Sequence, residues 1–184
     1  TTRLHQELAG GTFVDVIIDE AHDPASLHPF KGNMDLDKGE ALIKEKGVPA
    51  IPFVSLAGTV NMAGGQPVSM ENVQALRALC DRHGIPIYLD ATRMVENAFF
   101  IQEREEKYSD VPIADILKEF CGYCDGAWMS AKKDSLVNIG GWVAVNDSDL
   151  FAVLKNMVVI YEGLHTYGGM TGRDMEAMAI GIVE

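Results

Sequence analysis

Two kinds of hydrophobic pattern alternate along the chain. Short apolar runs typical of strands lie between longer segments in which apolar residues recur every three or four positions, as in amphipathic helices. The predicted strands cover Thr12–Asp19, Ile51–Leu56, Ile85–Asp90, Ala127–Met129 and Trp142–Asn146. The predicted helices cover Leu36–Lys46, Ser69–His83, Val95–Glu106, Ile113–Cys121, Ser148–Asn156 and Arg173–Ile182. Strands separated by such helices indicate βαβ units, so the pattern predicts an α/β fold with a mainly parallel sheet flanked by helices.

The organisation along the chain indicates one domain core. No internal repeat, linker or low-complexity segment interrupts the alternation of strands and helices. The chain opens on Thr1 without an initiator Met, and the helical pattern that ends at Ile182 has no stop signal. We therefore expect residues 1–184 to be an interior part of a longer protein, truncated at both ends.

Composition and charge narrow the classes of function. With 184 residues, 47% of them hydrophobic and 23% charged, the chain is long enough to bury a core and ordinary for a globular protein. Its formal net charge of −12 argues against nucleic acid and anionic membrane surfaces as partners, because both attract basic patches. No apolar run is long enough to cross a bilayer and no signal peptide opens the chain, which favours the cytoplasm.

The cysteines favour a reducing compartment. The chain has three cysteines, Cys80, Cys121 and Cys124, and a disulfide framework would need a larger and even number. The spacing of Cys121 and Cys124 matches that of redox-active pairs. The pair follows the helical pattern that starts at Ile113 and lacks the flanking Trp and Pro of thioredoxin-like sites, which favours a structural role. A thiol oxidoreductase is kept as an alternative hypothesis.

Polar residues follow the predicted strands at the points where those strands end. Asn61 comes after the second strand, Asp90 ends the third, and Arg93 stands three residues later. The adjacent Lys132 and Lys133 come after the fourth strand. Because ligands bind at the carboxyl ends of parallel strands, we expect these side chains to converge on one edge of the sheet.

This set of side chains matches the needs of pyridoxal 5′-phosphate. A carboxylate such as Asp90 holds a pyridine nitrogen protonated, and a desolvated, neutral lysine such as Lys133 forms a Schiff base with an aldehyde. Asn61 and Arg93 can hydrogen-bond a phenolate oxygen on the other side of the ring. Simpler interpretations are a helix cap for Asp90, a surface pair of Arg93 with Glu96, a turn for Asn61 and solvated lysines. The order of the residues on successive strands favours the cofactor site.

Four motifs resemble those of the β-eliminating lyases, a family of pyridoxal phosphate enzymes with the aspartate aminotransferase fold (fold type I). They are Thr59–Ser69, Asp90–Ala98, Ser130–Asp134 and Tyr167–Gly169. The resemblance runs over essentially the whole chain. It implies that residues 1–184 are the central part of the cofactor-binding large domain, truncated at both ends.

Within the family, the motifs point more to the branch that cleaves tyrosine. Val137–Gly141, Asp90–Arg93 and Gly172–Met178 resemble that branch. Ser130–Lys133 and Thr166–Tyr167 resemble the branch that cleaves tryptophan, and Leu164–His165 departs from both. The resemblance implies β-elimination of an aromatic L-amino acid, namely tyrosine to phenol, pyruvate and ammonia. Tryptophan to indole, pyruvate and ammonia is the alternative, and a non-catalytic fragment of such an enzyme is a second one.

The resemblance also implies a role for each matched residue. Lys133 matches the lysine that forms the Schiff base and moves protons at the α-carbon of the substrate. Lys132 matches a second active-site lysine near the cofactor phosphate. Asp90 matches the carboxylate paired with the pyridine nitrogen. Asn61 and Arg93 match the residues that contact the phenolic oxygen of the ring.

Further expectations concern the phosphate, a metal ion and the assembly. Ser130 matches a phosphate contact, and the backbone carbonyl of Asn138 matches one ligand of a monovalent cation, usually K⁺. In the family, the phosphate cup, a stacking aromatic ring and a cation-binding glutamate precede the matched region, and the arginine that binds the substrate carboxylate follows it. The resemblance also implies a homotetramer in which two subunits build each site.

Overall fold

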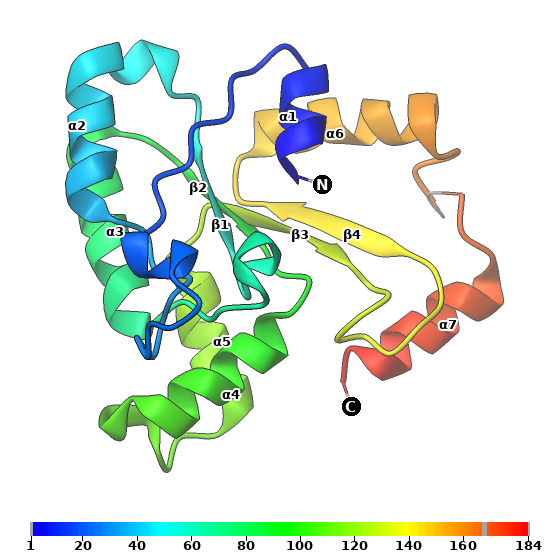
Figure 1. Ribbon diagram of the computed structural model, residues 1–184. Coiled ribbons are helices and arrows are strands. Elements are labelled where there is room, and N and C mark those ends of the chain that lie inside the picture. Colours follow the sequence, from blue (N-terminus) through cyan, green and yellow to red (C-terminus); the bar gives the residue numbers. More distant parts are fainter. Residues whose placement is uncertain (1, 167–168, 184) are drawn as a thin grey trace.

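The computed structural model describes residues 2–166 and 169–183, and its centre is a four-stranded sheet (Figure 1). The strands β1 (Val54–Ala57), β2 (Ile87–Asp90), β3 (Gly126–Ser130) and β4 (Gly141–Val145) lie in the order β1-β2-β3-β4. The first three run parallel, and β4 is antiparallel to β3 because a loop without a crossover helix joins the two. The predicted α/β fold with a mainly parallel sheet is confirmed.

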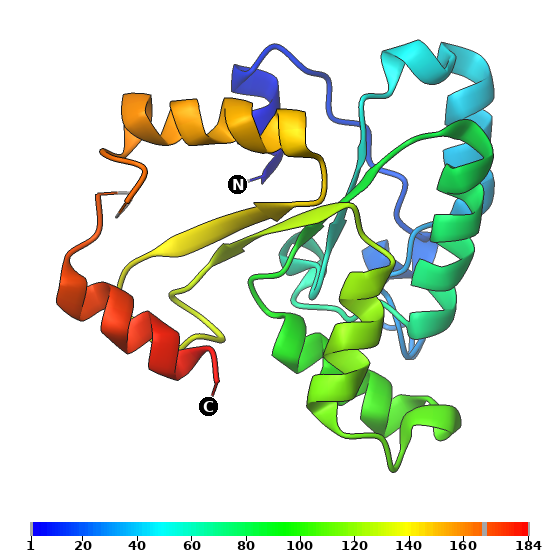
Figure 2. The ribbon, with the colours of Figure 1, turned by 180° about the vertical axis from the view of Figure 1, so that it is seen from behind.

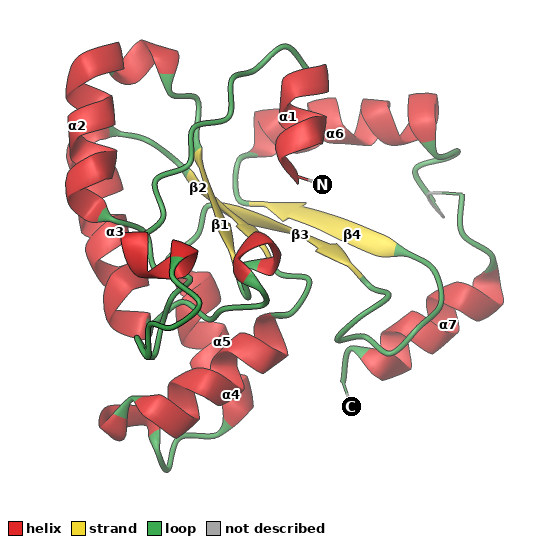
Figure 3. Cartoon of the chain, viewed as in Figure 1, coloured by secondary structure: helices red, strands yellow, loops and turns green. Residues whose placement is uncertain are grey.

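Helices flank this sheet (Figure 3). The α-helices are α1 (Thr2–Leu8), α2 (Leu36–Lys46), α3 (Met70–His83), α4 (Met94–Arg104), α5 (Ile113–Gly122), α6 (Ser148–Tyr161) and α7 (Gly172–Gly181). The 3-10 turns are η1 (Asp19–His22), η2 (Val48–Ala50), η3 (Asn61–Ala63) and η4 (Glu106–Tyr108). Helix α2 lies beside α3, α4 packs on α5, and α6 and α7 lie toward opposite ends of β4 (Figures 1 and 2). None of the described helices is long and apolar enough to cross a membrane.

The core lies between β2 and helices α3, α4 and α5. The predicted apolar face of α3 is buried through Val73, Leu76 and Leu79, and the Ser69 hydroxyl caps this helix by accepting from the Asn72 N–H (3.1 Å). The largest fully buried side chains include Phe120, Met70, Leu76, Ile85, Ile87, Leu89, Ile101 and Ile116. These contacts fix β2 at the centre of the molecule.

The predicted strand Thr12–Asp19 is wrong. The segment forms one isolated bridge, Ile17 with Met34, outside the sheet, and its last residue begins η1. The Asp15 carboxylate accepts a hydrogen bond from the Ile17 N–H (3.0 Å), a local turn that competes with extended pairing. Val14 is 46% exposed, so the apolar residues of this segment do not form a face packed on the sheet.

The other predicted elements are present with shifted ends. Strand ends differ from the prediction by up to three residues. The helix predicted over Val95–Glu106 ends at Arg104, because Glu105 leaves it and accepts a hydrogen bond from the Met70 N–H (2.6 Å). The helix predicted over Ser148–Asn156 is longer than predicted and ends at Tyr161.

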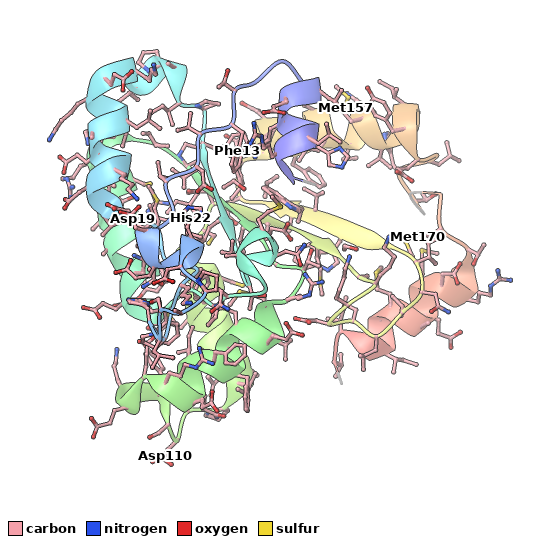
Figure 4. All side chains as sticks on the ribbon, in the orientation of Figure 1. Phe13, Asp19, His22, Asp110, Met157 and Met170 are labelled. Carbon is pink, nitrogen blue, oxygen red and sulfur yellow. The ribbon has the colours of Figure 1, made fainter. Side chains whose placement is uncertain are left out.

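The side of the molecule formed by β4, α6 and α7 is less covered than the rest. No residue of α6 or α7 is buried. Ile160 and Tyr161 are 68% and 77% exposed, and Met157 projects from α6 at the top of Figure 4. The described residues therefore leave the apolar side chains of these helices largely in contact with solvent.

Asn97 on α4 fastens the segment that leads into α3. Its side chain is fully buried, accepts from the Val68 N–H (2.8 Å) and donates to the Val68 carbonyl (2.9 Å). Asn72 makes the same two bonds with the backbone of Met34, at 2.9 Å each, but is half-buried.

Asn97→Ala is expected to lower the free energy of unfolding by about 2–5 kcal/mol, because it leaves two buried backbone groups without partners. Asn72→Ala is the matched control and should cost less, because water can reach the freed groups of Met34. Urea denaturation of both variants measures the difference. Equal losses of unfolding free energy in the two variants would show that burial does not determine how much these asparagine–backbone hydrogen bonds stabilise the fold.

Glu105 is expected to make stability fall as the pH rises. Burial raises the pKa of its carboxyl, and the hydrogen bond from Met70 lowers it by a smaller amount. A carboxyl with a raised folded-state pKa favours the fold most when protonated, so its contribution is lost as the pH rises through that pKa. Glu105→Gln keeps the acceptor and should lose less stability than the wild type between about pH 4 and pH 7. Urea denaturation at stepped pH tests this, and parallel curves would contradict it.

Candidate functional site

Three parallel strands end side by side at one edge of the sheet. Ala57 pairs with Asp90, and Asp90 pairs with Trp128, so β1, β2 and β3 reach this edge in register. The pairing continues past the strand ends, where the Gly58 N–H donates to the Asp90 carbonyl (3.1 Å) and the Ala91 N–H to the Trp128 carbonyl (2.8 Å). The loops that follow the three strands therefore meet here, where parallel sheets bind ligands.

A path of hydrogen bonds connects Asp90 with Lys133. Asp90 Oδ1 accepts from the Thr92 N–H (3.2 Å), and Thr92 Oγ1 accepts from the Ser130 N–H (3.1 Å). Ser130 Oγ accepts from Lys133 Nζ (3.0 Å). All four residues are half-buried. The structure thus joins three of the predicted site residues in one connected group.

Arg93 and Asn61 belong to the same edge. The Arg93 N–H donates to the Gly58 carbonyl (3.0 Å), which places the start of α4 beside the end of β1. Asn61 begins η3 in the loop that follows β1, and it is exposed. Lys132 is exposed, whereas its neighbour Lys133 is half-buried, so the two lysines have different surroundings.

The lysine loop, residues 131–140, joins β3 to β4 and carries both lysines. The Ala131 N–H donates to the Gly140 carbonyl (3.0 Å) and closes the loop at its base. Ser135 is buried within it. Gly181 of α7 packs so closely against the loop that a Cβ at this position would overlap the Ser135 carbonyl oxygen. The loop is therefore held between the sheet and α7.

Asp134 attaches the lysine loop to α4. Its carboxylate accepts from the Val95 N–H (2.8 Å) in the first turn of α4 and caps that helix from a distant part of the chain. Burial raises the pKa of Asp134, and the hydrogen bond from Val95 lowers it. Two nearby charges act in opposite directions, since Glu96 raises this pKa and Arg93 lowers it.

Sequence reasoning misses the residues that link the site. Thr92 and Asp134 lie inside motifs of the family resemblance, but no role was assigned to them. The sequence signal that could have identified them is a hydroxyl or a carboxylate close to the predicted site residues. Thr59 also has no assigned role but makes no such link, because its Oγ1 is buried without a hydrogen-bond partner among the described residues. Tyr167 and Gly168 of the fourth motif lie outside the described residues.

Asn138 lies in the same loop but in a different environment. It is exposed and lines a hollow of about 180 Å³ between the lysine loop and α7. The other lining residues are Leu136, Val137, Ile139, Asp174 and Ala177. No cluster of three or more His, Cys, Asp or Glu residues that could hold a metal occurs in residues 2–166 and 169–183. The predicted cation position thus has oxygen donors nearby but no built acidic cluster.

A larger hollow of about 560 Å³ lies at the opposite, amino edge of the sheet. It is lined by Arg77, Gly84, Ile85, Pro86, Tyr88, Asp125, Asn146 and Asp147. Arg77 and the Ile87 N–H both donate to the Asp125 carboxylate, at 2.7 Å each. Arg77 and Asp125 pair with each other, and the Asp147 carboxylate caps α6 by accepting from the Leu150 N–H (2.7 Å), which indicates a structural junction rather than the predicted chemistry.

Comparison with known proteins shows which family and which relatives this chain is similar to. The model of the family described as beta-eliminating lyase matches residues 1–182. The whole chain aligns with tyrosine phenol-lyases of Nostoc punctiforme (68% identity, 39% of that protein), Symbiobacterium thermophilum (62%, 40%) and Clostridium tetani (60%, 40%). The chain therefore spans about two fifths of the length of these relatives. A solved structure from Exiguobacterium sp. 255-15, carrying the name aromatic amino acid beta-eliminating lyase/threonine aldolase, has a TM-score of 0.49 at 21% identity over 67% of this chain and 30% of that one.

The cysteines are poorly suited to redox chemistry. All three are free thiols, and Cys80 and Cys124 are buried. Burial raises the pKa of Cys80 to about 11 and that of Cys124 to about 12, and it also raises the pKa of Cys121. A reactive pair needs a stabilised thiolate, which these surroundings disfavour.

We expect the native protein to react slowly with a thiol-specific disulfide reagent at pH 8. With a pKa of about 11, about one Cys80 thiol in a thousand is ionised at that pH. Half-buried Cys121 should react first, and the other two only after unfolding in urea. Time-resolved absorbance of the released thiolate measures the order. Rapid reaction of Cys124 in the native state would revive the oxidoreductase hypothesis.

Proposed function

The chain belongs to the β-eliminating lyase family, and we propose that it forms part of a pyridoxal 5′-phosphate site that cleaves tyrosine to phenol, pyruvate and ammonia. The observation that carries the proposal is the hydrogen-bonded path from Asp90 through Thr92 and Ser130 to Lys133. The names of the most similar relatives favour tyrosine over tryptophan as the substrate. The reaction consumes one water and needs no external oxidant or reductant.

The donor set at the carboxyl edge fits the cofactor. Lys133 offers a primary amine for covalent attachment, and Asp90 offers a carboxylate for the protonated pyridine nitrogen. Arg93 and Asn61 offer hydrogen-bond donors for the phenolic oxygen. The buried Thr59 hydroxyl, without a partner among the described residues, leaves one further polar group at this edge for a ligand. When bound, pyridoxal phosphate supplies an electron sink for the electrons of the broken Cα–H bond.

Lys133 and Asp90 carry the proton chemistry in this proposal. Lys133 Nζ would take the α-proton of the substrate, and general-base catalysis of this kind typically contributes about 10²–10⁴-fold to the rate. The hydrogen bond to Ser130 Oγ holds Nζ at the end of β3. The Asp90 carboxylate keeps the ring nitrogen protonated through its opposite charge. The two groups would therefore act on the same cofactor, Lys133 as the base and Asp90 as the partner of the ring nitrogen.

Ser130 and Lys132 are the candidates for the phosphate side. The Ser130 hydroxyl accepts from Lys133 and has its own proton to donate. Lys132 is exposed and cationic, which suits an anionic group. The carbonyl of Asn138 would provide one ligand of a K⁺ ion, with further oxygen ligands from residues beyond those described here.

The assembly follows from the same resemblance. We propose a cytoplasmic homotetramer in which another subunit completes the site. The three free cysteines support a reducing compartment, and the exposed apolar side chains of α6 and α7 leave surface for further packing.

The proposal is tested with Lys133→Ala in the complete gene product that contains these 184 residues. With pyridoxal phosphate, the wild type should show an absorption band above about 400 nm, and the variant should not, because the attachment point is lost. Lys118→Ala, at an exposed lysine of α5, is the matched control and should retain the band.

Product assays separate the substrates. Pyruvate should form from tyrosine and not from tryptophan, and Lys133→Ala should lower its rate by at least about 100-fold. Pyruvate from tryptophan would move the proposal to the other branch of the family. A wild type without the band and without ammonia release would identify a non-catalytic protein.

A further inference from the structure

We propose that Asp134 is a positioning residue that fixes Lys133 relative to Arg93 by tying the lysine loop to the first turn of α4. The inference rests on the proposed function, because it places Lys133 and Arg93 on the same cofactor. Neither the family motif nor the position of Asp134 after β3 assigns this task to it. The assignment rests on the contacts that its carboxylate makes.

The first half of the tie is covalent. Asp134 follows Lys133 directly, and the two residues share one turn, since the Lys133 carbonyl accepts from the Leu136 N–H (3.0 Å). A displacement of Asp134 therefore moves the backbone from which the Lys133 side chain extends. The bond from Nζ to Ser130 Oγ holds only the tip of that side chain. Asp134 holds its base.

The second half of the tie is the hydrogen bond to α4. Val95, whose N–H donates to Asp134 at 2.8 Å, lies two residues after Arg93. Arg93 is the residue before α4 and is itself fastened to the end of β1 through Gly58. One carboxylate thus connects the loop after β3 with the loop after β2. These two loops carry the amine and the guanidinium of the candidate site.

Charge adds to this geometry. The positive charge of Arg93 lowers the pKa of Asp134, against the larger effect of burial, which raises it. Glu96 in the same turn opposes the effect of Arg93.

Glu105 provides a matched comparison within the same protein. It also caps a helix from outside, accepting from the Met70 N–H of α3 at 2.6 Å. Its neighbours in the chain include no predicted site residue. Removing Glu105 therefore removes a cap of the same kind and leaves the lysine loop unchanged.

The experiment compares Asp134→Ala, Asp134→Asn and Glu105→Ala with the wild type in the complete gene product. Three quantities are measured: cofactor bound per protein, visible circular dichroism per bound cofactor, and amide hydrogen exchange without cofactor. Asp134→Ala should weaken pyridoxal phosphate binding about tenfold, as expected for a lost hydrogen bond to a charged group. It should also lower the circular dichroism per bound cofactor and speed exchange in residues 93–97 and 131–136 together.

Asp134→Asn keeps an acceptor for Val95 and should restore most of the circular dichroism. Glu105→Ala should speed exchange at the start of α3 and leave the circular dichroism per bound cofactor unchanged. Circular dichroism unchanged in Asp134→Ala, or equally reduced in Glu105→Ala, would overturn the positioning role. A wild type that binds no pyridoxal phosphate overturns the proposed function instead, and the exchange data then decide separately whether the tie exists.

Discussion

The candidate site depends on the parallel register of β1, β2 and β3. Because Ala57, Asp90 and Trp128 stand at the same level, the backbone leaves all three strands at one edge. The hydrogen bond from Gly58 to the Asp90 carbonyl continues that register beyond the last paired residues. Every further link, from Thr92 to Ser130 and on to Lys133, requires these strand ends to be neighbours. A slip of one residue would turn Asp90 to the other face of the sheet.

Sequence patterns predicted the parts of this arrangement that periodicity and strand order determine. The helices from Leu36 onward, the mainly parallel sheet and the placing of Asp90, Arg93 and Lys133 after successive strands follow from apolar repeats and from the alternation of strands and helices. The false strand Thr12–Asp19 shows the limit, because a short apolar run predicts a strand but not whether a neighbouring strand is free to pair with it. The local hydrogen bond to Asp15 and the bridge between Ile17 and Met34 keep this segment out of the sheet.

The linking residues could not be predicted because their partners are far away in the chain. Asp134 and Val95 are 39 positions apart, and Glu105 and Met70 are 35 apart. In both cases a carboxylate supplied from elsewhere satisfies an orphan N–H at the start of a helix. Helix α4 has Arg93 at its start and no capping bond from that side chain, so its first turn relies on the lysine loop. The hydrogen bond from the Val95 N–H to Asp134 therefore both caps α4 and holds the lysine loop beside it.

The contact between Gly181 and Ser135 gives α7 a single rotational setting. The helix can approach the lysine loop only along the strip where it lacks a side chain, and a turn about its axis would drive a neighbouring side chain into the Ser135 carbonyl. The backbone of α7 at Gly181 thus forms the outer wall of the turn that carries Lys133.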